Sequence, residues 1–309
     1  MARHSKLHLP TREGVSPSCV ALPSGPWPTV LDYLAQRLPK IEREDWAQRM
    51  ARGEVLDADG RALGADAPYR QQTRVYYYRS LPAERRIPFE ECVVYSDAHI
   101  VVADKPHFLP TIPTGNYVQE TLLVRLKRRL GIDTLVPLHR LDRETAGLVL
   151  FSVDPATRNR YHTLFRERLV HKEYEAIAPL RADLPLPTLR RSRLMENPAA
   201  FMQMLEVEGE PNAETAIELL EQRGNLARYL LKPVTGQRHQ LRVHLAALGR
   251  PIVGDLIYPV LQPDAMVTQE GPDYFGRPLQ LLARTLAFDC PLTGRPLRFD
   301  SGRRLALPA

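Results

Sequence analysis

The chain has 309 residues, of which 44% are hydrophobic, and a formal net charge of +6. These values exclude a fibrous or wholly disordered chain and are typical of a globular protein. No stretch reaches the roughly 18 to 20 consecutive apolar residues that span a bilayer, and the start, MARHSKLHLPTREG, lacks the apolar core of a signal peptide. We therefore expect a cytoplasmic protein without a membrane partner, and the excess of basic residues favours a polyanionic partner.

Residues 1–27 are predicted to form an extended arm, because prolines stand at positions 10, 17, 23 and 26. A helix is predicted after Thr29, which serves as its N-cap. Its buried face consists of Val30, Leu31, Leu34 and Leu38. A second helix is predicted from near Glu42 to Gly53, and residues 73–79 alternate as a strand does.

This helix, helix, strand order over residues 28–80 resembles the alpha-L RNA-binding motif, a small module found in RNA-modifying enzymes. The positions that carry the resemblance are Leu31, Leu34, Arg43, Trp46, Arg49 and Gly53. The resemblance implies an RNA-binding domain. The alternative is a helical subdomain without a role in RNA binding.

Residues 81–91, LPAERRIPFEE, are predicted to be a linker, since they combine two prolines with a run of charges. The rest of the chain, 92–309, is predicted to be one catalytic domain. It begins with a hairpin of residues 93–95 and 100–103. Further strands are predicted within 173–178, 201–208, 214–221 and 227–234, and helices within 121–131, 155–169 and 238–249. The fold class that this order predicts is α+β, with a mixed, largely antiparallel central sheet and flanking helices.

The helix predicted within 155–169 begins with residues that are typical of a helix N-terminus. Asp154 is its predicted N-cap, Pro155 its first residue, and Leu169 the last residue of its buried stripe.

Several kinds of chemistry are excluded by the motifs that the sequence lacks. It has no glycine-rich phosphate loop and no G-x-S-x-G elbow. Cys19, Cys92 and Cys290 are too far apart for a disulfide framework or a paired zinc site. His239 and His244 are separated by five positions with no glutamate between them, so no metal site is expected. The candidates that remain are carboxylates and aromatic residues among arginines.

The first candidate, Asp142, lies in HRLDRETAGLVLF, residues 139–151. Charged residues in this stretch come directly before the apolar run 147–151, which is predicted to be a buried strand. A carboxylate held beside an arginine stays ionised, and it can act as a nucleophile or base without a metal. The alternative is a structural Arg–Asp pair at the mouth of a strand, which the spacing alone favours.

A second charged stretch, residues 230–255, reads LLKPVTGQRHQLRVHLAALGRPIVGD. Its basic side chains load one turn and the following helix with positive charge: Lys232, Arg238, His239, Arg242, His244 and Arg250. The free N–H groups of a helix N-terminus favour an anion there. The alternative is a solvated basic face.

The two stretches together resemble the RluA-type pseudouridine synthase family. HRLDRETAG is similar to the family motif H-R-L-D-x-x-T-S-G, and TGQRHQLRVHLAALGRPIVGD is similar to G-R-T-H-Q-I-R-V-H followed by H-P-I-x-G-D. Three further stretches match the family in the same order, VVYSDAHIVVADKPHFLPTIP, HKEYEAIA and LLARTLAFDCPLTGRPLRF. The resemblance covers residues 92–300 and implies a pseudouridine synthase fold.

The resemblance also implies a reaction. A pseudouridine synthase breaks the C1′–N1 bond of a uridine, rotates the uracil and rejoins it through C5. No atoms are exchanged, so no cofactor is expected, and no nucleotide cofactor in particular. The resemblance makes Asp142 the nucleophile, and attack on C1′ and addition to C6 both remain open.

Further residue roles are implied by the same resemblance. Arg242 pairs with the nucleophile, and Tyr174 stacks on the uracil. Arg140 fills the space that a flipped base leaves, since a planar guanidinium can stack there. We expect His139, Arg238 and Lys232 to contact the RNA with it.

The sequence departs from the family pattern at a few positions. Gln237 stands where an arginine is usual, Leu282 replaces a common histidine, and Cys290 replaces a histidine before a proline. These changes put fine positioning and substrate choice in doubt, and they leave the reaction class unchanged.

An enzyme acting on ribosomal or transfer RNA as a monomer is therefore the expected function. The alternative is a catalytically silent RNA-binding or RNA-folding module on the same fold. The intact set Asp142, Tyr174 and Arg242 favours the enzyme.

Overall fold

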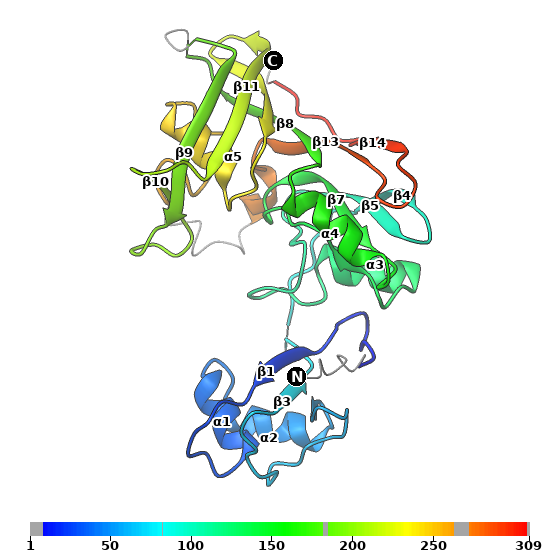
Figure 1. Ribbon diagram of the computed structural model, residues 1–309. Helices are drawn as coiled ribbons and strands as arrows, with labels where there is room; N and C mark the ends of the chain where they lie inside the picture. The colour runs from blue at the N-terminus through cyan, green and yellow to red at the C-terminus, as the bar shows by residue number, and fades with distance from the viewer. Residues whose placement is uncertain (1–8, 82, 182–184, 263–271, 308–309) are drawn as a thin grey trace. The chain divides into compact units, whose positions relative to one another are not determined.

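The computed structural model describes residues 9–81, 83–181, 185–262 and 272–307 (Figure 1). The chain divides into two compact units. The first contains Met1–Arg85, Thr114–Gln119 and Val124–Asp133, and the second contains the remaining segments, Arg86–Pro113, Glu120–Leu123 and Thr134–Ala309. The chain first passes from one unit to the other between Arg85 and Arg86, inside the segment 81–91 that was expected to be a linker.

Residues 114–119 and 124–133 differ from the expectation of one continuous domain over 92–309, because they belong to the first unit. Val118 and Val124 form a small buried cluster with Val15. Lys127 Nζ also donates a hydrogen bond to Ser16 Oγ at 2.8 Å. Apolar contact with the segment around Val15 thus assigns these residues to the N-terminal unit.

The first unit contains two helices, α1 (Val30–Arg37) and α2 (Arg43–Ala51). The expected N-cap is confirmed, since Thr29 Oγ1 accepts a hydrogen bond from Asp32 N at 3.1 Å. Three strands form its sheet in the order β1-β3-β2, namely β1 (Ser18–Ala21), β2 (Val55–Leu56) and β3 (Arg74–Tyr77). Residues 1–8 of the expected arm lie outside the described residues, and residues 18–21 are a paired strand of the sheet.

The second unit is built on an eleven-stranded sheet whose main path is β10-β9-β11-β12-β8-β13-β7-β5-β4. The strands are β4 (Cys92–Ser96), β5 (Ile100–Lys105), β6 (Val136–Pro137), β7 (Ala146–Ser152), β8 (His171–Pro179), β9 (Thr188–Glu196), β10 (Met204–Val207), β11 (Ala213–Arg223), β12 (Leu226–Pro233), β13 (Leu281–Asp289) and β14 (Pro296–Asp300). Among the described strands, β13 and β7 are parallel and the other pairs are antiparallel. The predicted fold class is therefore confirmed.

The three helices described after residue 120 differ from the predicted helices mainly in where they begin and end. They are α3 (Leu122–Leu130), α4 (Arg158–Arg166) and α5 (Gln240–Ala247), with a short 3₁₀ helix at Pro272–Gly276. Asp154 does not cap α4, because its carboxylate accepts from Ala156 N in a turn that precedes the helix. Leu169 is 58% exposed and not buried as expected, since α4 ends at Arg166 and Arg168 takes a positive φ of 58°.

Two apolar cores lie along the sheet. The first packs Tyr161 and Leu164 of α4 against side chains of β5, β7, β13 and β14. The second packs Leu241 and Leu245 of α5 against side chains of β8, β11, β12 and β13. Because β13 contributes to both cores, it fixes the two halves of the sheet relative to each other.

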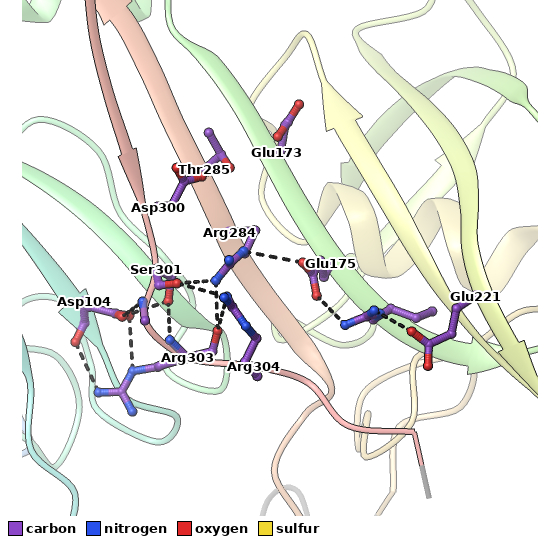
Figure 2. A network of polar contacts seen from close by, with 12 residues as sticks. Asp104, Glu173, Glu175, Glu221, Arg284, Thr285, Asp300, Ser301, Arg303 and Arg304 are labelled. Atoms are coloured by element: carbon purple, nitrogen blue, oxygen red, sulfur yellow. Dashed lines mark hydrogen bonds and ion pairs between the residues drawn. The ribbon is translucent and has the colours of Figure 1, made fainter.

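A polar network joins the strands in the middle of this sheet (Figure 2). Asp104, at the end of β5, accepts hydrogen bonds from Ser301 Oγ at 2.8 Å, Gly302 N at 3.0 Å and Arg303 Nε at 3.2 Å. Arg284 of β13 lies 3.5 Å from Glu175 of β8 and donates a hydrogen bond to the Ser301 carbonyl. The network therefore ties β5, β8 and β13 to the chain that follows β14.

Gly147 allows β7 to approach β13 closely. Its φ is +112°, and a Cβ placed there would overlap the Ala283 carbonyl oxygen and lie 2.6 Å from Ala283 N. Only glycine adopts this conformation without strain. The parallel pair of β7 and β13, which places Leu282 beside Ala146, depends on this contact.

His139, the first residue of the stretch 139–151, holds the start of that stretch against β7. Its Nε2 accepts a hydrogen bond from Leu150 N at 3.0 Å, and its ring stacks on Phe165 with centroids 4.8 Å apart. Burial, helped by the charge of Lys172, lowers the pKa of His139 to about 3. The imidazole is therefore neutral and holds residues 139–142 against a buried strand.

Gly147→Ala is expected to destabilise the protein by about 2 to 5 kcal/mol, since it adds backbone strain and a steric overlap with Ala283. Urea unfolding measures the change, with Gly276→Ala as the control, because a Cβ at Gly276 meets no atom within 4 Å. Equal stability of the two variants would contradict the close approach.

His139 also predicts how stability depends on pH. Its folded pKa of about 3 is below its ordinary value of 6.5, so the unfolded chain takes up the proton first. The stabilisation is complete above pH 6.5 and falls by about 1.4 kcal/mol per pH unit as the pH drops towards 3. His139→Gln, which keeps an acceptor, should show a shallower loss of unfolding free energy between pH 6.5 and 4. Identical slopes for the wild type and His139→Gln would refute the assignment.

Candidate active site

Asp142 lies in the loop between β6 and β7, with its side chain 30% exposed. The backbone on both sides is fixed. Thr145 N donates to the Asp142 carbonyl at 3.2 Å, and Thr111 Oγ1 both donates to the Leu141 carbonyl at 2.9 Å and accepts from Leu141 N at 3.2 Å. The carboxylate is therefore held in place and remains accessible from solvent.

Lys105 donates a hydrogen bond to the backbone of the same loop. The sequence motifs did not assign it a role. It is completely buried, and its Nζ donates to the carbonyls of Pro106, Leu109 and Arg143 at 3.0, 2.8 and 3.0 Å. Burial lowers the pKa of Lys105 to about 7, although Glu144 and Asp142 act in the opposite direction. The D-K-P sequence at residues 104–106 was the signal that could have identified it.

Arg242 comes from the first turn of α5 and is 1% exposed. Its main partner is Asp255, whose carboxylate accepts from Nε at 2.8 Å and from Nη2 at 2.6 Å. Its remaining Nη1 lies 3.5 Å from Asp142 Oδ2. Burial acts to lower the pKa of Arg242, but the Asp255 ion pair outweighs it and raises that pKa well above its usual value. The expected pair with Asp142 is thus present and is the weaker of two.

Asp255 is a functional residue that the sequence analysis missed. Its side chain is 1% exposed, and Oδ1 also accepts from the backbone N of Ile257 and Tyr258. It fixes the guanidinium plane of Arg242, so that Nη1 is the nitrogen that faces Asp142. The G-D pair at the end of the family signature was the available signal.

A second side chain, at the start of α5, faces the Asp142 carboxylate. His239, the N-cap residue of the helix, has Nε2 3.8 Å from Asp142 Oδ2, and its side chain is 8% exposed. Its Nδ1 lies 3.0 Å from Tyr258 Oη. The motif contained His239, but its position beside the carboxylate could not be read from the spacing.

Tyr174 lies in β8, opposite Leu231 of β12 and Ala283 of β13. It packs against the core that contains Leu231 and Leu241. Burial, together with the charge of Asp142, raises the pKa of Tyr174 above its usual value. The phenol is therefore protonated and near enough to the carboxylate to be affected by its charge.

Two of the expected RNA-contacting arginines are exposed. Arg140 makes no hydrogen bond or ion pair with any residue in the described part of the chain. Arg238 Nη1 lies 3.8 Å from Glu196 Oε1 at the end of β9. Both guanidinium groups are accessible to a ligand.

Lys232 and His139 each contact another part of the protein. Successive side chains of a strand point to opposite faces, and Leu231 shares the face of Tyr174, so Lys232 lies on the other face. There its Nζ pairs with Glu218 at 2.7 Å. His139 holds β7 as described above. Both side chains therefore make contacts within the protein, and their expected contacts with RNA stay predictions.

The basic stretch 230–255 is not a solvated face as a whole. Arg242, His244 and Arg250 are at most 1% exposed. His244 hydrogen-bonds Ser192 Oγ at 3.1 Å and Thr215 Oγ1 at 3.0 Å. These groups build the interior around α5, and the exposed charge is left to Arg238 at its start.

The three departures from the family pattern make different contacts. Leu282 is fully buried beside Ala146. Cys290 Sγ lies 3.7 Å from Tyr161 Oη. Gln237 is exposed and donates to the Asn212 carbonyl at 3.3 Å.

Comparison with known proteins identifies the same region of the chain. The model of a family described as RNA pseudouridylate synthase matches residues 99–247. A solved structure titled Human RNA Pseudouridylate Synthase Domain Containing 1 superposes with a TM-score of 0.56 and 23% identity, covering 69% of this chain and 84% of that one. This likeness supports the fold.

Curated relatives extend the match over most of the chain. An uncharacterized RNA pseudouridine synthase of Synechocystis is 30% identical over 233 residues, 74% of this chain and 79% of its own. The human pseudouridylate synthase RPUSD2 is 34% identical, but only 29% of its length is covered. The dual-specificity RNA pseudouridine synthase RluA of Haemophilus influenzae is 32% identical over 68% of this chain and 91% of its own length. The chain therefore belongs to the RluA-type RNA pseudouridine synthases, a family of enzymes that modify RNA.

Proposed function

We propose that this enzyme uses Asp142 as the nucleophile when it isomerises uridine to pseudouridine in structured RNA. The observation that carries the proposal is the environment of one carboxylate. Asp142 is 30% exposed, lies 3.5 Å from the buried Arg242, and is close enough to raise the pKa of Tyr174. A charged, fixed and accessible carboxylate is what a covalent mechanism requires.

The chemistry needs no group from outside the chain and the RNA. Asp142 attacks C1′ of the ribose or adds to C6 of the uracil, and the C1′–N1 bond breaks. The uracil then turns, C5 bonds to C1′, and the bond between Asp142 and the substrate breaks. The proton on C5 is lost while N1 gains one. Arg242 orients the carboxylate, and the Tyr174 ring stacks on the uracil.

Arg140 is assigned the role of replacing the target base in the stack. A uridine within a helix must be flipped out before it reacts, at a cost of a few kcal/mol. Arg140 is two residues from Asp142, exposed, and free of partners among the described residues. Its planar guanidinium can stack between the neighbouring bases. Arg238 is assigned a phosphate contact on the same grounds of exposure and charge.

The N-terminal unit is proposed to bind RNA, as its resemblance to the alpha-L motif implies. The proposed substrates are ribosomal or transfer RNA, and the name dual-specificity given to several relatives supports more than one RNA. We further propose that the enzyme acts as a monomer in the cytoplasm. No described helix is long and apolar enough to cross a membrane.

Asp142→Asn is expected to lower pseudouridine formation by at least about 10³-fold, because the amide cannot act as the nucleophile. The assay is tritium release from total RNA of cells that lack the gene, labelled at C5 of uracil, since C5 exchanges its hydrogen for C1′. The exposed Asp289→Asn is the matched control and should keep wild-type activity. Wild-type tritium release by Asp142→Asn would refute the assignment.

The same pair of variants separates the enzyme from a silent RNA-binding module. Suppose that Asp142→Asn restored the function of gene-deleted cells as fully as the wild type does, and that neither the wild type nor Asp142→Asn released tritium. The chain would then act only by binding or folding RNA.

Arg140→Ala is expected to reduce modification of a uridine in a base-paired site by about 10- to 100-fold, which corresponds to a flipping cost of a few kcal/mol. The same uridine in an unpaired fragment should react at close to the wild-type rate. Arg140→Lys is the control for charge, since it keeps the positive charge without the planar fork and should resemble the alanine variant. An equal loss on both RNAs would show that Arg140 acts on the chemistry and not on flipping.

A further inference from the structure

A chain of three contacts leads from the edge of the sheet to the nucleophile. Met204 N, at the start of β10, donates to Tyr258 Oη at 2.7 Å. Tyr258 Oη lies 3.0 Å from His239 Nδ1, and His239 Nε2 lies 3.8 Å from Asp142 Oδ2. All of these atoms belong to the second unit.

The contacts determine which nitrogen of His239 carries its proton. Tyr258 Oη already accepts the hydrogen of Met204 N, and in the described structure its other polar contact is His239 Nδ1. Nδ1 is the acceptor within reach of the phenol hydrogen among the described residues, so a phenol donor and an Nδ1 acceptor satisfy both groups. A neutral imidazole has one N–H, so that hydrogen lies on Nε2, the nitrogen that faces Asp142.

The environment keeps this histidine neutral. Burial lowers the pKa of His239, and the nearby charges of Arg242 and Arg238 act in the same direction, against those of Asp142 and Glu144. Burial also raises the pKa of Tyr258 to about 12, so the phenol retains its hydrogen. The Tyr258 hydroxyl thus fixes the tautomer of His239, and the Nε2–H of His239 faces the Asp142 carboxylate.

The backbone of His239 is strained in a way that helix capping does not explain. Its φ is +53°, in the left-handed region, and its side chain makes no capping hydrogen bond to α5. Such a conformation costs about 1 kcal/mol or more for a residue other than glycine. What the conformation achieves is the placement of the ring between Tyr258 and Asp142.

We propose that His239 is a positioning residue that orients the Asp142 carboxylate through its Nε2–H, and that Tyr258 sets its tautomer. This inference rests on the proposed function of Asp142. Oδ2 faces both Arg242 Nη1 and His239 Nε2, so Oδ1 is left to attack the substrate. The distance of 3.8 Å exceeds a hydrogen bond, and the contact shortens when RNA occupies the site, as catalytic hydrogen bonds do.

Two substitutions of His239 separate its two nitrogens. Glutamine carries an amide near the position of Nε2, whereas asparagine reaches only that of Nδ1. Asparagine tolerates a positive φ better than glutamine does, so backbone strain favours the asparagine variant. Any selective loss of activity in His239→Asn then reports the missing Nε2–H and not a damaged fold.

The experiment measures the single-turnover rate of tritium release with saturating enzyme, the Kd for the same labelled RNA, and the thermal unfolding midpoint. We expect His239→Asn to lose about 10- to 100-fold in rate, because small misplacements of a reacting group have effects of this size. His239→Gln should stay within about threefold of the wild type, and Tyr258→Phe should lose about 10-fold. The RNA Kd should be unchanged in all three. The exposed His162→Asn is the matched control.

Two results would overturn the inference. One is a wild-type rate in His239→Asn while Asp142→Asn is inactive, which would leave the role of Asp142 intact. The other is a loss of rate in His239→Gln and Tyr258→Phe with His239→Asn unaffected, which would make the Nδ1–Tyr258 contact a structural link only. If Asp142→Asn itself kept the wild-type rate, the proposed nucleophile would be wrong, and the inference would fail with it.

Discussion

The bidentate ion pair between Arg242 and Asp255 is the interaction on which the rest of the site depends. Both side chains are almost fully buried, and removing one partner of such a pair leaves an uncompensated charge that costs about 3 to 5 kcal/mol. The pair joins α5 to the segment that follows it, and it fixes the plane of the guanidinium. Because Asp255 takes Nε and Nη2, Arg242 faces Asp142 with Nη1 and does not enclose it.

Several surrounding groups together hold the partly exposed carboxylate of Asp142 in place. Lys105 links the Arg143 carbonyl of the loop to the carbonyls of Pro106 and Leu109, which follow β5. His139 holds the start of the loop against β7. Tyr174 supplies a neutral ring from β8. Asp142 itself thus has few direct contacts, and its carboxylate stays accessible because other residues hold the loop in place.

Several features could be predicted from local sequence. The Thr29 cap, the hairpin of β4 and β5, the buried strand β7 and the mixed sheet all follow from periodicity and turn signals, and the structure has them. Predictions failed where tertiary contacts decide. The end of α4 before Leu169 depends on a positive φ at Arg168. Strand β1 was taken for part of an arm because its pairing partner, β3, is far away in sequence.

The sequence by itself determined the family and singled out Asp142, Tyr174 and Arg242 as candidate site residues, because these residues lie in long motifs whose order along the chain is specific. Only the tertiary structure decided how they work together. It placed Asp255 on the guanidinium of Arg242, Lys105 beneath the loop, and His239 beside the carboxylate. Asp142 and Arg242 are a hundred residues apart, and contacts of this kind depend on how two helices and a twisted sheet pack, which no local pattern of residues contains.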